Sequence, residues 1–159
     1  MAICQTHLRH FAKQHRSLSA VLKAINEAMH LSMQRDMFVS MVYAIIELDT
    51  EKLTLAGAGH ELPFIYDPHR AGNHDVEPIK SPGMAIGMVA PEIFDAVIKD
   101  TSVHFGDEAA LLLYTDGVTE AVNLEGDEYS RERLVETLRA NGKKKSVQMI
   151  LDTTLDTVS

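Results

Sequence analysis

The dipeptide Asp116-Gly117 follows shortly after the apolar residues 109–114 and is the best candidate for a functional site in this sequence. A strand that ends at a carboxylate holds that group in place, and an adjacent glycine lets backbone or water approach a bound cation closely. These residue types fit a metal ligand. Asp-Gly is also among the commonest turn dipeptides, so spacing alone leaves a plain turn as the alternative.

Two further residues are candidates for places near such a site. His60 follows Gly59, whose small size permits close packing and could present the imidazole in a loop. A structural turn is the favoured interpretation there, and a role near the site is the alternative. Glu120 lies four residues after Asp116, where it could bind a metal's outer water shell or simply face solvent. The sequence does not choose between these two.

Composition narrows the class of protein. The 159 residues are 45% hydrophobic, which suits one domain with its own core. The 15 Lys and Arg against 23 Asp and Glu give a net charge of −8, which argues against nucleic-acid binding. A small anionic substrate remains compatible if a bound cation reverses the local field.

The single cysteine, Cys4, excludes a disulfide framework and favours a reducing compartment. No apolar run approaches the roughly 20 residues of a membrane span. The first 26 residues contain four basic residues and no acidic one, yet they are typical of an ordinary helix rather than a targeting segment. We therefore expect a cytoplasmic protein that binds neither membrane nor nucleic acid.

The elements that must position these residues follow an α+β order. Two helices fill the first third, and Ser17 is the predicted N-cap of the second. In residues 37–46 both the odd-numbered and the even-numbered positions are mostly apolar, which predicts a core strand covered on both faces. Residues 49–52 supply a turn, so a hairpin to residues 53–56 is expected, followed by a short strand at 64–66.

The second half predicts fewer and shorter elements. Residues 67–92 contain most of the prolines and predict a long loop, with a strand near residues 94–98. Residues 109–114 predict the most continuously buried strand of the chain. A helix over residues 131–140, capped by Asn141-Gly142, precedes a last helix that begins at Ser146.

Several motifs occur in one order along nearly the whole chain, at residues 36–39, 58–60, 83–87, 106–107 and 112–121. Together they resemble the SpoIIE-type branch of the PPM metal-dependent serine/threonine protein phosphatases. That resemblance implies a β-sandwich flanked by helices in αββα layers. It also implies a binuclear Mn²⁺ or Mg²⁺ centre that activates water, with Asp116 as metal ligand and Gly117 beside it. The implied substrate is a phosphorylated regulatory protein such as an anti-sigma-factor antagonist, and the full chain is expected to carry a sensor or receiver domain.

The sequence departs from the family pattern at two places. The family's Gly-Asp-x-x-Gly-His-Gly type motif is missing, since Gly106-Asp107 and Gly126-Asp127 are each followed by Glu, and its final Asp-Asp or Asp-Asn pair is missing, since after Ser146 only Asp152 and Asp156 occur, in a helical pattern. We therefore interpret residues 1–159 as a single phosphatase domain incomplete at both ends, with little activity alone. The alternative is a non-catalytic signalling or docking module. Missing strands would leave open sheet edges, so dimerisation is also expected.

Overall fold

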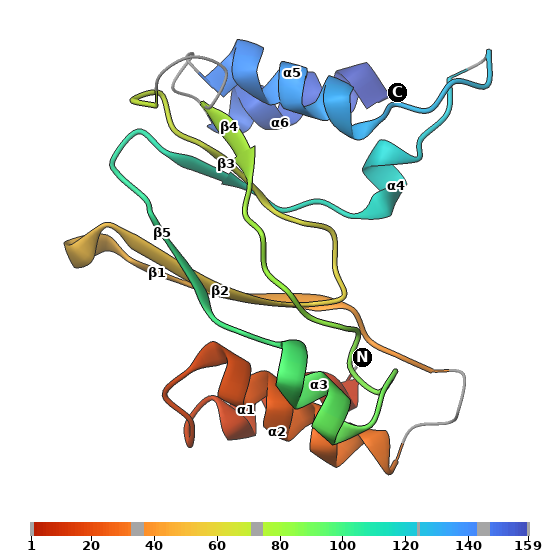
Figure 1. Cartoon of the computed structure of the whole chain (residues 1–159). Helices are drawn as coiled ribbons and strands as arrows, with labels where there is room; N and C mark the ends of the chain where they lie inside the picture. The colour runs from red at the N-terminus through yellow and green to blue at the C-terminus, as the bar shows by residue number, and fades with distance from the viewer. Residues whose placement is uncertain (1, 33–36, 71–74, 124, 143–146, 159) are drawn as a thin grey trace. The chain divides into compact units, whose positions relative to one another are not determined.

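The computed structural model of the chain describes residues 2–32, 37–70, 75–123, 125–142 and 147–158. They form two compact units, each built from two stretches of chain: Met1–His60 with Lys80–His104, and Glu61–Ile79 with Phe105–Ser159. Each unit combines a three-stranded antiparallel sheet with helices (Figure 1), which confirms the α+β class. The single domain over residues 1–159 stays a prediction.

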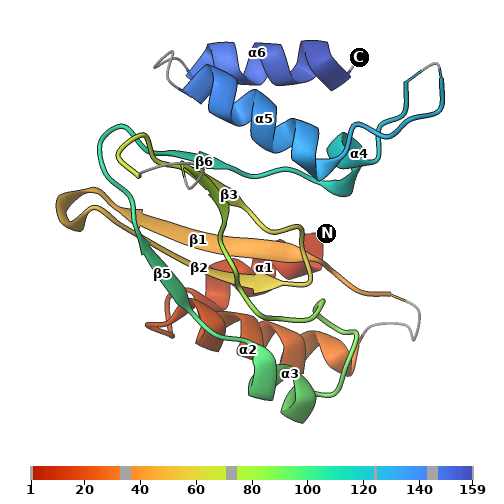
Figure 2. The same ribbon diagram turned by 45° about the horizontal axis from the view of Figure 1, so that its top comes forward.

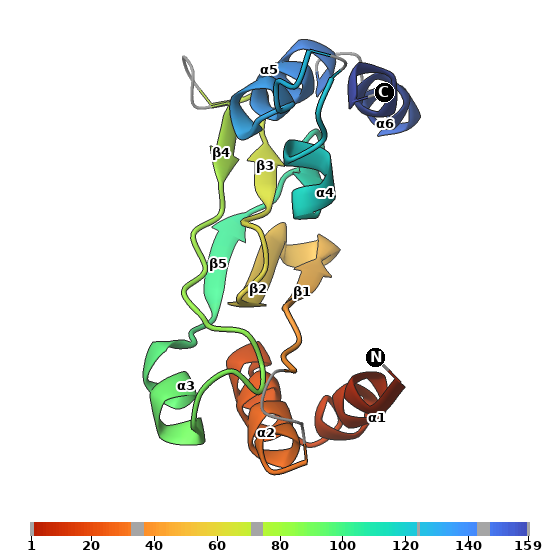
Figure 3. The same cartoon turned by 90° about the vertical axis from the view of Figure 1, so that its right-hand side faces the viewer.

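The first unit packs three helices on one face of a sheet ordered β1-β2-β5 (Figure 3). Its elements are α1 (Ala2–Phe11), α2 (Leu18–His30), β1 (Met41–Glu47), the 3₁₀ turn η1 (Leu48–Thr50), β2 (Lys52–Ala58), α3 (Pro91–Val97) and β5 (Thr101–His104). The predicted hairpin is confirmed, because β1 pairs antiparallel with β2 from Met41↔Ala58 to Glu47↔Lys52. Glu51 turns the chain there in the left-handed region, at φ 48°.

Helix α2 is the centre of the first core. Ser17 caps it as predicted, since its side chain accepts a hydrogen bond from the Ala20 N–H at 3.2 Å. Leu22 and Ile25 are fully buried against the sheet. Asn26 is fully buried too, and its Oδ1 accepts a hydrogen bond from the Gly87 N–H at 2.8 Å. This bond compensates the desolvation of one polar atom and ties α2 to the loop before α3.

The predicted strand near residues 94–98 is wrong, because this segment lies mostly in α3. Pro91 stands in the first turn, where its missing N–H costs nothing. Phe94 and Ile98 are buried in the first core while Ile93 is 53% exposed. Their four-residue separation follows the helical period, which a short apolar run does not reveal.

The predicted core strand at residues 37–46 is also corrected. Strand β1 begins only at Met41 and lies at the edge of its sheet, and Ile45 and Ile46 are 46% and 41% exposed. Before it, Val39 makes an isolated bridge to Ile86. A strand with apolar residues at both odd and even positions can therefore be an edge strand whose two faces are only partly covered.

The second unit has a sheet ordered β4-β3-β6 with α5 and α6 side by side over one face (Figure 2). Its elements are β3 (Phe64–Tyr66), β4 (Val76–Pro78), β6 (Ala110–Leu112), α4 (Asp116–Thr119), α5 (Arg131–Gly142) and α6 (Val147–Val158). Strand β3 is confirmed, and all three of its residues are buried. The predicted loop at 67–92 contains β4 and the start of α3, and Ser146 lies outside the described residues.

Two expectations for this unit are wrong. The buried strand at 109–114 shrinks to the three half-buried residues of β6, because β3 offers only three partners. Asn141-Gly142 does not cap α5, since both residues belong to it. Asn141 donates from Nδ2 to the Thr137 carbonyl at 2.9 Å, and a Cβ at Gly142 would lie 2.6 Å from Tyr66 Cζ. Glycine is needed there for packing rather than for a turn.

A close crossing of two backbones in the first unit predicts which glycines are essential. A Cβ on Gly83 would overlap the Gly57 carbonyl oxygen, and one on Gly59, at φ 65°, would lie 2.5 Å from the Ala85 nitrogen. We expect Gly83→Ala to lower the free energy of unfolding by about 3 kcal/mol, because backbone cannot move aside as a side chain can.

Gly126→Ala is the control: Gly126, unlike Gly83, has a positive φ, 90°, but no described atom lies within 4 Å of the added methyl group. It should cost about 1 kcal/mol from backbone conformation alone. Urea unfolding of both variants measures the difference. Equal losses would contradict the crossing.

Candidate active site

Asp116 is exposed and is the first residue of α4, four residues beyond the end of β6. It therefore does not terminate the strand as predicted. The ladder stops at the Phe64↔Leu112 pair because Pro63, which lacks an N–H, precedes β3. The Asp116 Oδ1 accepts a hydrogen bond from the Gly117 N–H at 2.8 Å, and its carbonyl accepts one from the Glu120 N–H at 2.8 Å.

The structure brings three of the four predicted site residues together. Gly117 and Glu120 share the α4 turn with Asp116, and Glu120 is exposed. A Cβ on Gly117 would meet only Thr115 Oγ1, at an ordinary 3.6 Å, so packing among the described residues does not require glycine there. His60 is half-buried at the end of the first unit's leading stretch. Its place near Asp116 stays a prediction.

Sequence reasoning missed the side chains that anchor the Asp116 segment. Tyr114 is buried and stacks on Phe64, with ring centroids 5.6 Å apart. Its hydroxyl donates to Glu61 Oε2 at 3.3 Å, and the same oxygen accepts from an Arg131 terminal nitrogen at 2.6 Å. Glu61 and Arg131 are 70 residues apart, and no local pattern relates them.

The electrostatics of this cluster keep Arg131 cationic. The hydrogen bond to Glu61 raises the pKa of Arg131 above its ordinary value. Burial raises the pKa of Tyr114, so its hydroxyl stays protonated and can donate. A charged Glu61 therefore has two donors on a single oxygen, of which the guanidinium is the shorter and charge-assisted one.

Backbone hydrogen bonds hold α4 against the start of α5. The Tyr129 N–H donates to the Ala121 carbonyl at 2.7 Å, and the Ser130 N–H donates to the Thr119 carbonyl at 2.9 Å. Next to the Ala121–Tyr129 bond, towards the tip of the intervening loop, Val122 and Glu128 make an isolated bridge. Ser130 has a φ of 70°, a left-handed conformation that is uncommon for serine, so this junction stores some backbone strain.

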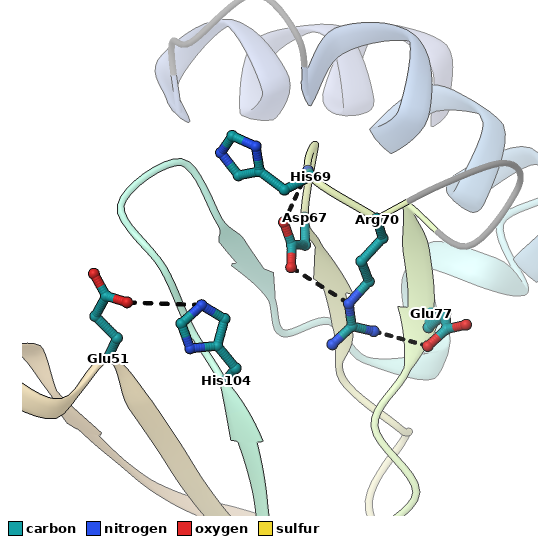
Figure 4. Close-up of polar contacts among 6 residues, drawn as sticks. All are labelled: Glu51, Asp67, His69, Arg70, Glu77 and His104. Carbon is teal, nitrogen blue, oxygen red and sulfur yellow. Dashed lines mark hydrogen bonds and ion pairs between the residues drawn. The ribbon is translucent and has the colours of Figure 1, made fainter.

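Other acidic side chains of the second unit are occupied by structural contacts. Asp67, which is buried, accepts from the His69 backbone N–H at 3.0 Å and pairs with Arg70 at 3.4 Å, and Arg70 also reaches Glu77 at 2.8 Å (Figure 4). Buried Asp75 pairs with Arg139 at 2.7 Å. In the first unit, Glu51 and His104 make a separate pair at 3.7 Å. These contacts brace turns and strand ends.

The residues that the structure describes do not fit a binuclear metal centre by themselves. Within the described ranges, no group of three or more His, Cys, Asp and Glu side chains is arranged to hold a metal ion. Asp116 provides one exposed carboxylate beside Glu120. Two bridged ions need several carboxylate or water ligands each.

None of the helices in the described ranges is both long enough and apolar enough to span a bilayer.

The chain is similar to known proteins over its whole length. Residues 1–159 match the family described as Stage II sporulation protein E (SpoIIE). The phosphoserine phosphatase RsbU of Bacillus subtilis (strain 168) is 29% identical over 139 residues, which is 86% of this chain and 39% of RsbU. The chain therefore spans well under half the length of this curated relative.

Solved structures agree on the fold. The SiaA-PP2C domain of Pseudomonas aeruginosa superposes with a TM-score of 0.77 at 18% identity, covering 99% of this chain and 60% of that one. The PP2C phosphatase domain of SpoIIE from Bacillus subtilis, solved with a fragment of its regulatory domain, gives 0.73 at 17% identity, covering 98% and 42%. The catalytic domain of PstP in complex with 2 manganese ions gives 0.59 at 15%, covering 98% and 74%. The fold is PP2C-like.

Two tyrosines of the second unit make a matched test of the anchoring cluster. Tyr114→Phe removes the hydroxyl that donates to Glu61, so we expect it to lower the free energy of unfolding by about 1 kcal/mol. The Tyr66 hydroxyl is buried and has no hydrogen-bond partner among the described residues. Tyr66→Phe should therefore leave stability unchanged or raise it. Chemical denaturation distinguishes the two, and a larger loss in Tyr66→Phe would refute this assignment.

Proposed function

The chain belongs to the SpoIIE family, and on this premise we propose that it is a domain of a bacterial metal-dependent protein serine/threonine phosphatase. The family match over residues 1–159 carries the proposal. The PP2C-like fold supports it, and so does the place of Asp116, exposed on a short turn that a buried tyrosine anchors.

Within this function we propose Asp116 as a metal ligand with Gly117 beside it, and His60 and Glu120 as residues near the site. The cofactor is Mn²⁺ or Mg²⁺, which activates water so that no protein nucleophile is needed. Among the described residues, no group of three or more His, Cys, Asp and Glu side chains could hold a metal ion, so Asp116 would be one ligand of several. The proposal therefore requires further ligands from residues outside those described, in line with a domain that is incomplete in residues 1–159.

The substrate that we propose is phosphoserine or phosphothreonine on a regulatory protein, such as an anti-sigma-factor antagonist. The name of RsbU, a phosphoserine phosphatase, supports this class. A sensor or receiver domain attached to this one and a cytoplasmic location complete the proposal. The length of RsbU beyond the matched part supports the former.

A non-catalytic signalling or docking module is the second candidate. The observation that favours it is the lack of a three-ligand cluster among the described side chains. A homodimer would suit such a module, and the open edge at β1, with Ile45 and Ile46 exposed, supports self-association.

Turnover of a chromogenic phosphomonoester with added Mn²⁺ tests the proposed function. We expect little hydrolysis by residues 1–159 and efficient hydrolysis by a longer polypeptide that contains them together with the further ligands. In that polypeptide Asp116→Asn should lower kcat by about a hundredfold or more, because a neutral amide binds a divalent ion poorly. Asp127→Asn, in an exposed turn, is the control. Full activity in Asp116→Asn would reject the assignment.

Titration calorimetry with Mn²⁺ tests the assignment of Asp116 within this chain. One exposed carboxylate turn should bind Mn²⁺ weakly, with a dissociation constant of about a millimolar. The weak signal should disappear in Asp116→Asn. Tight binding of two ions by residues 1–159 would show that the missing ligands are present after all.

A further inference from the structure

Arg131 is the first basic residue after a long acidic stretch, and Arg133 follows it. Residues 105–132 contain eight Asp and Glu residues and one basic residue, Arg131. This stretch includes Asp116, so a phosphate that approaches the α4 turn meets mostly negative charge. In such surroundings one guanidinium has a large effect on whether an anion is attracted or repelled.

The Arg131 side chain is exposed and held in place at the same time. It is 50% exposed, whereas Arg70 and Arg139, which are paired with carboxylates in the same unit, are 29% and 32% exposed. One terminal nitrogen donates to Glu61 Oε2 at 2.6 Å, and Tyr114 braces that oxygen from the buried side. The guanidinium is therefore oriented before any ligand arrives.

Arg131 is linked to the Asp116 segment from both ends. Tyr114, two residues before Asp116, shares the Glu61 oxygen with Arg131. Ser130, directly before Arg131, donates its N–H to the carbonyl of Thr119 at the end of α4. Figures 1 and 2 accordingly show α4 beside the first turn of α5. Arg131 is thus joined, through Glu61 and Tyr114 and through Ser130, to residues that flank Asp116 on both sides.

We propose that Arg131 binds the phosphoryl group of a phosphomonoester at the α4 turn, with Glu61 as the residue that positions the guanidinium and competes with the phosphate for it. A guanidinium has five N–H donors, and the bond to Glu61 uses one of them. The remaining donors match two phosphoryl oxygens in a fork, which an ammonium group does not reproduce. This inference rests on the proposed function for its substrate class.

Binding of inorganic phosphate to the whole chain without metal tests the proposal, followed by NMR chemical shifts. We expect weak binding by the wild type, about tenfold weaker binding by Arg131→Gln, and partial recovery in Arg131→Lys. Glu61→Gln should bind phosphate more tightly, because it removes the competing charge. A purely structural ion pair would instead leave phosphate affinity unchanged in all three variants.

Arg133→Gln is the matched control, since Arg133 lies in the same helical turn but stacks over the Tyr129 ring at 4.8 Å. The double variant Glu61→Gln/Arg131→Gln keeps the pair neutral and guards against unfolding from an unpaired Glu61; it should bind phosphate about as weakly as Arg131→Gln. Wild-type affinity in Arg131→Gln or in the double variant, or no detectable binding by the wild type, would overturn the proposal.

A failure of the Arg131 proposal can be distinguished from a failure of the proposed phosphatase function. Phosphate binding is measured without Mn²⁺ and without turnover, so an inactive chain can still show the Arg131 effect. In an active longer polypeptide, Arg131→Gln should raise KM more than it lowers kcat, whereas Asp116→Asn should mainly lower kcat. The reverse pattern would contradict a phosphoryl-binding role for Arg131.

Discussion

The three buried residues of β3 place every sheet element of the second unit. Phe64, Ile65 and Tyr66 pair with β4 on one side and β6 on the other, and α5 packs over them. Because β3 is only three residues long, β6 is also short, and the chain leaves the sheet before it reaches Asp116. Beyond the end of β6, Tyr114 stacks on Phe64, and this contact holds the segment against the second unit's core. The position of the candidate ligand is thus set by strand length and by one aromatic pair.

Local patterns predicted what is locally determined. Ser17 caps α2, the hairpin after β1 forms, and β3 lies where its apolar residues indicate. Residues 94–98 were assigned to the wrong element because a short apolar run fits a strand and a helix equally well. The contacts among Tyr114, Glu61 and Arg131 could not be predicted, since they depend on tertiary packing across 53 and 70 residues.

Charge is handled differently in the core and around α4. The buried carboxylates Asp67 and Asp75 are each compensated by an arginine, which keeps a net charge of −8 compatible with a folded core. Among the described residues, the carboxylates of the α4 turn form no ion pair of this kind, and Arg131 pairs with Glu61 instead. Unpaired negative charge at the surface lowers the free energy of unfolding only slightly, and it favours the binding of a cation.

Because each unit is assembled from two separate stretches, the chain passes between the units at 60/61, 79/80 and 104/105. During synthesis β2 therefore cannot pair with β5 until later, because β3 and β4 emerge from the ribosome between them. The pairing joins residues as far apart as Lys52 and His104. Neither unit corresponds to a contiguous segment that could be expressed or released intact by one cleavage. Inheritance by gene fusion or shuffling would have to move both units together, even though each has its own core.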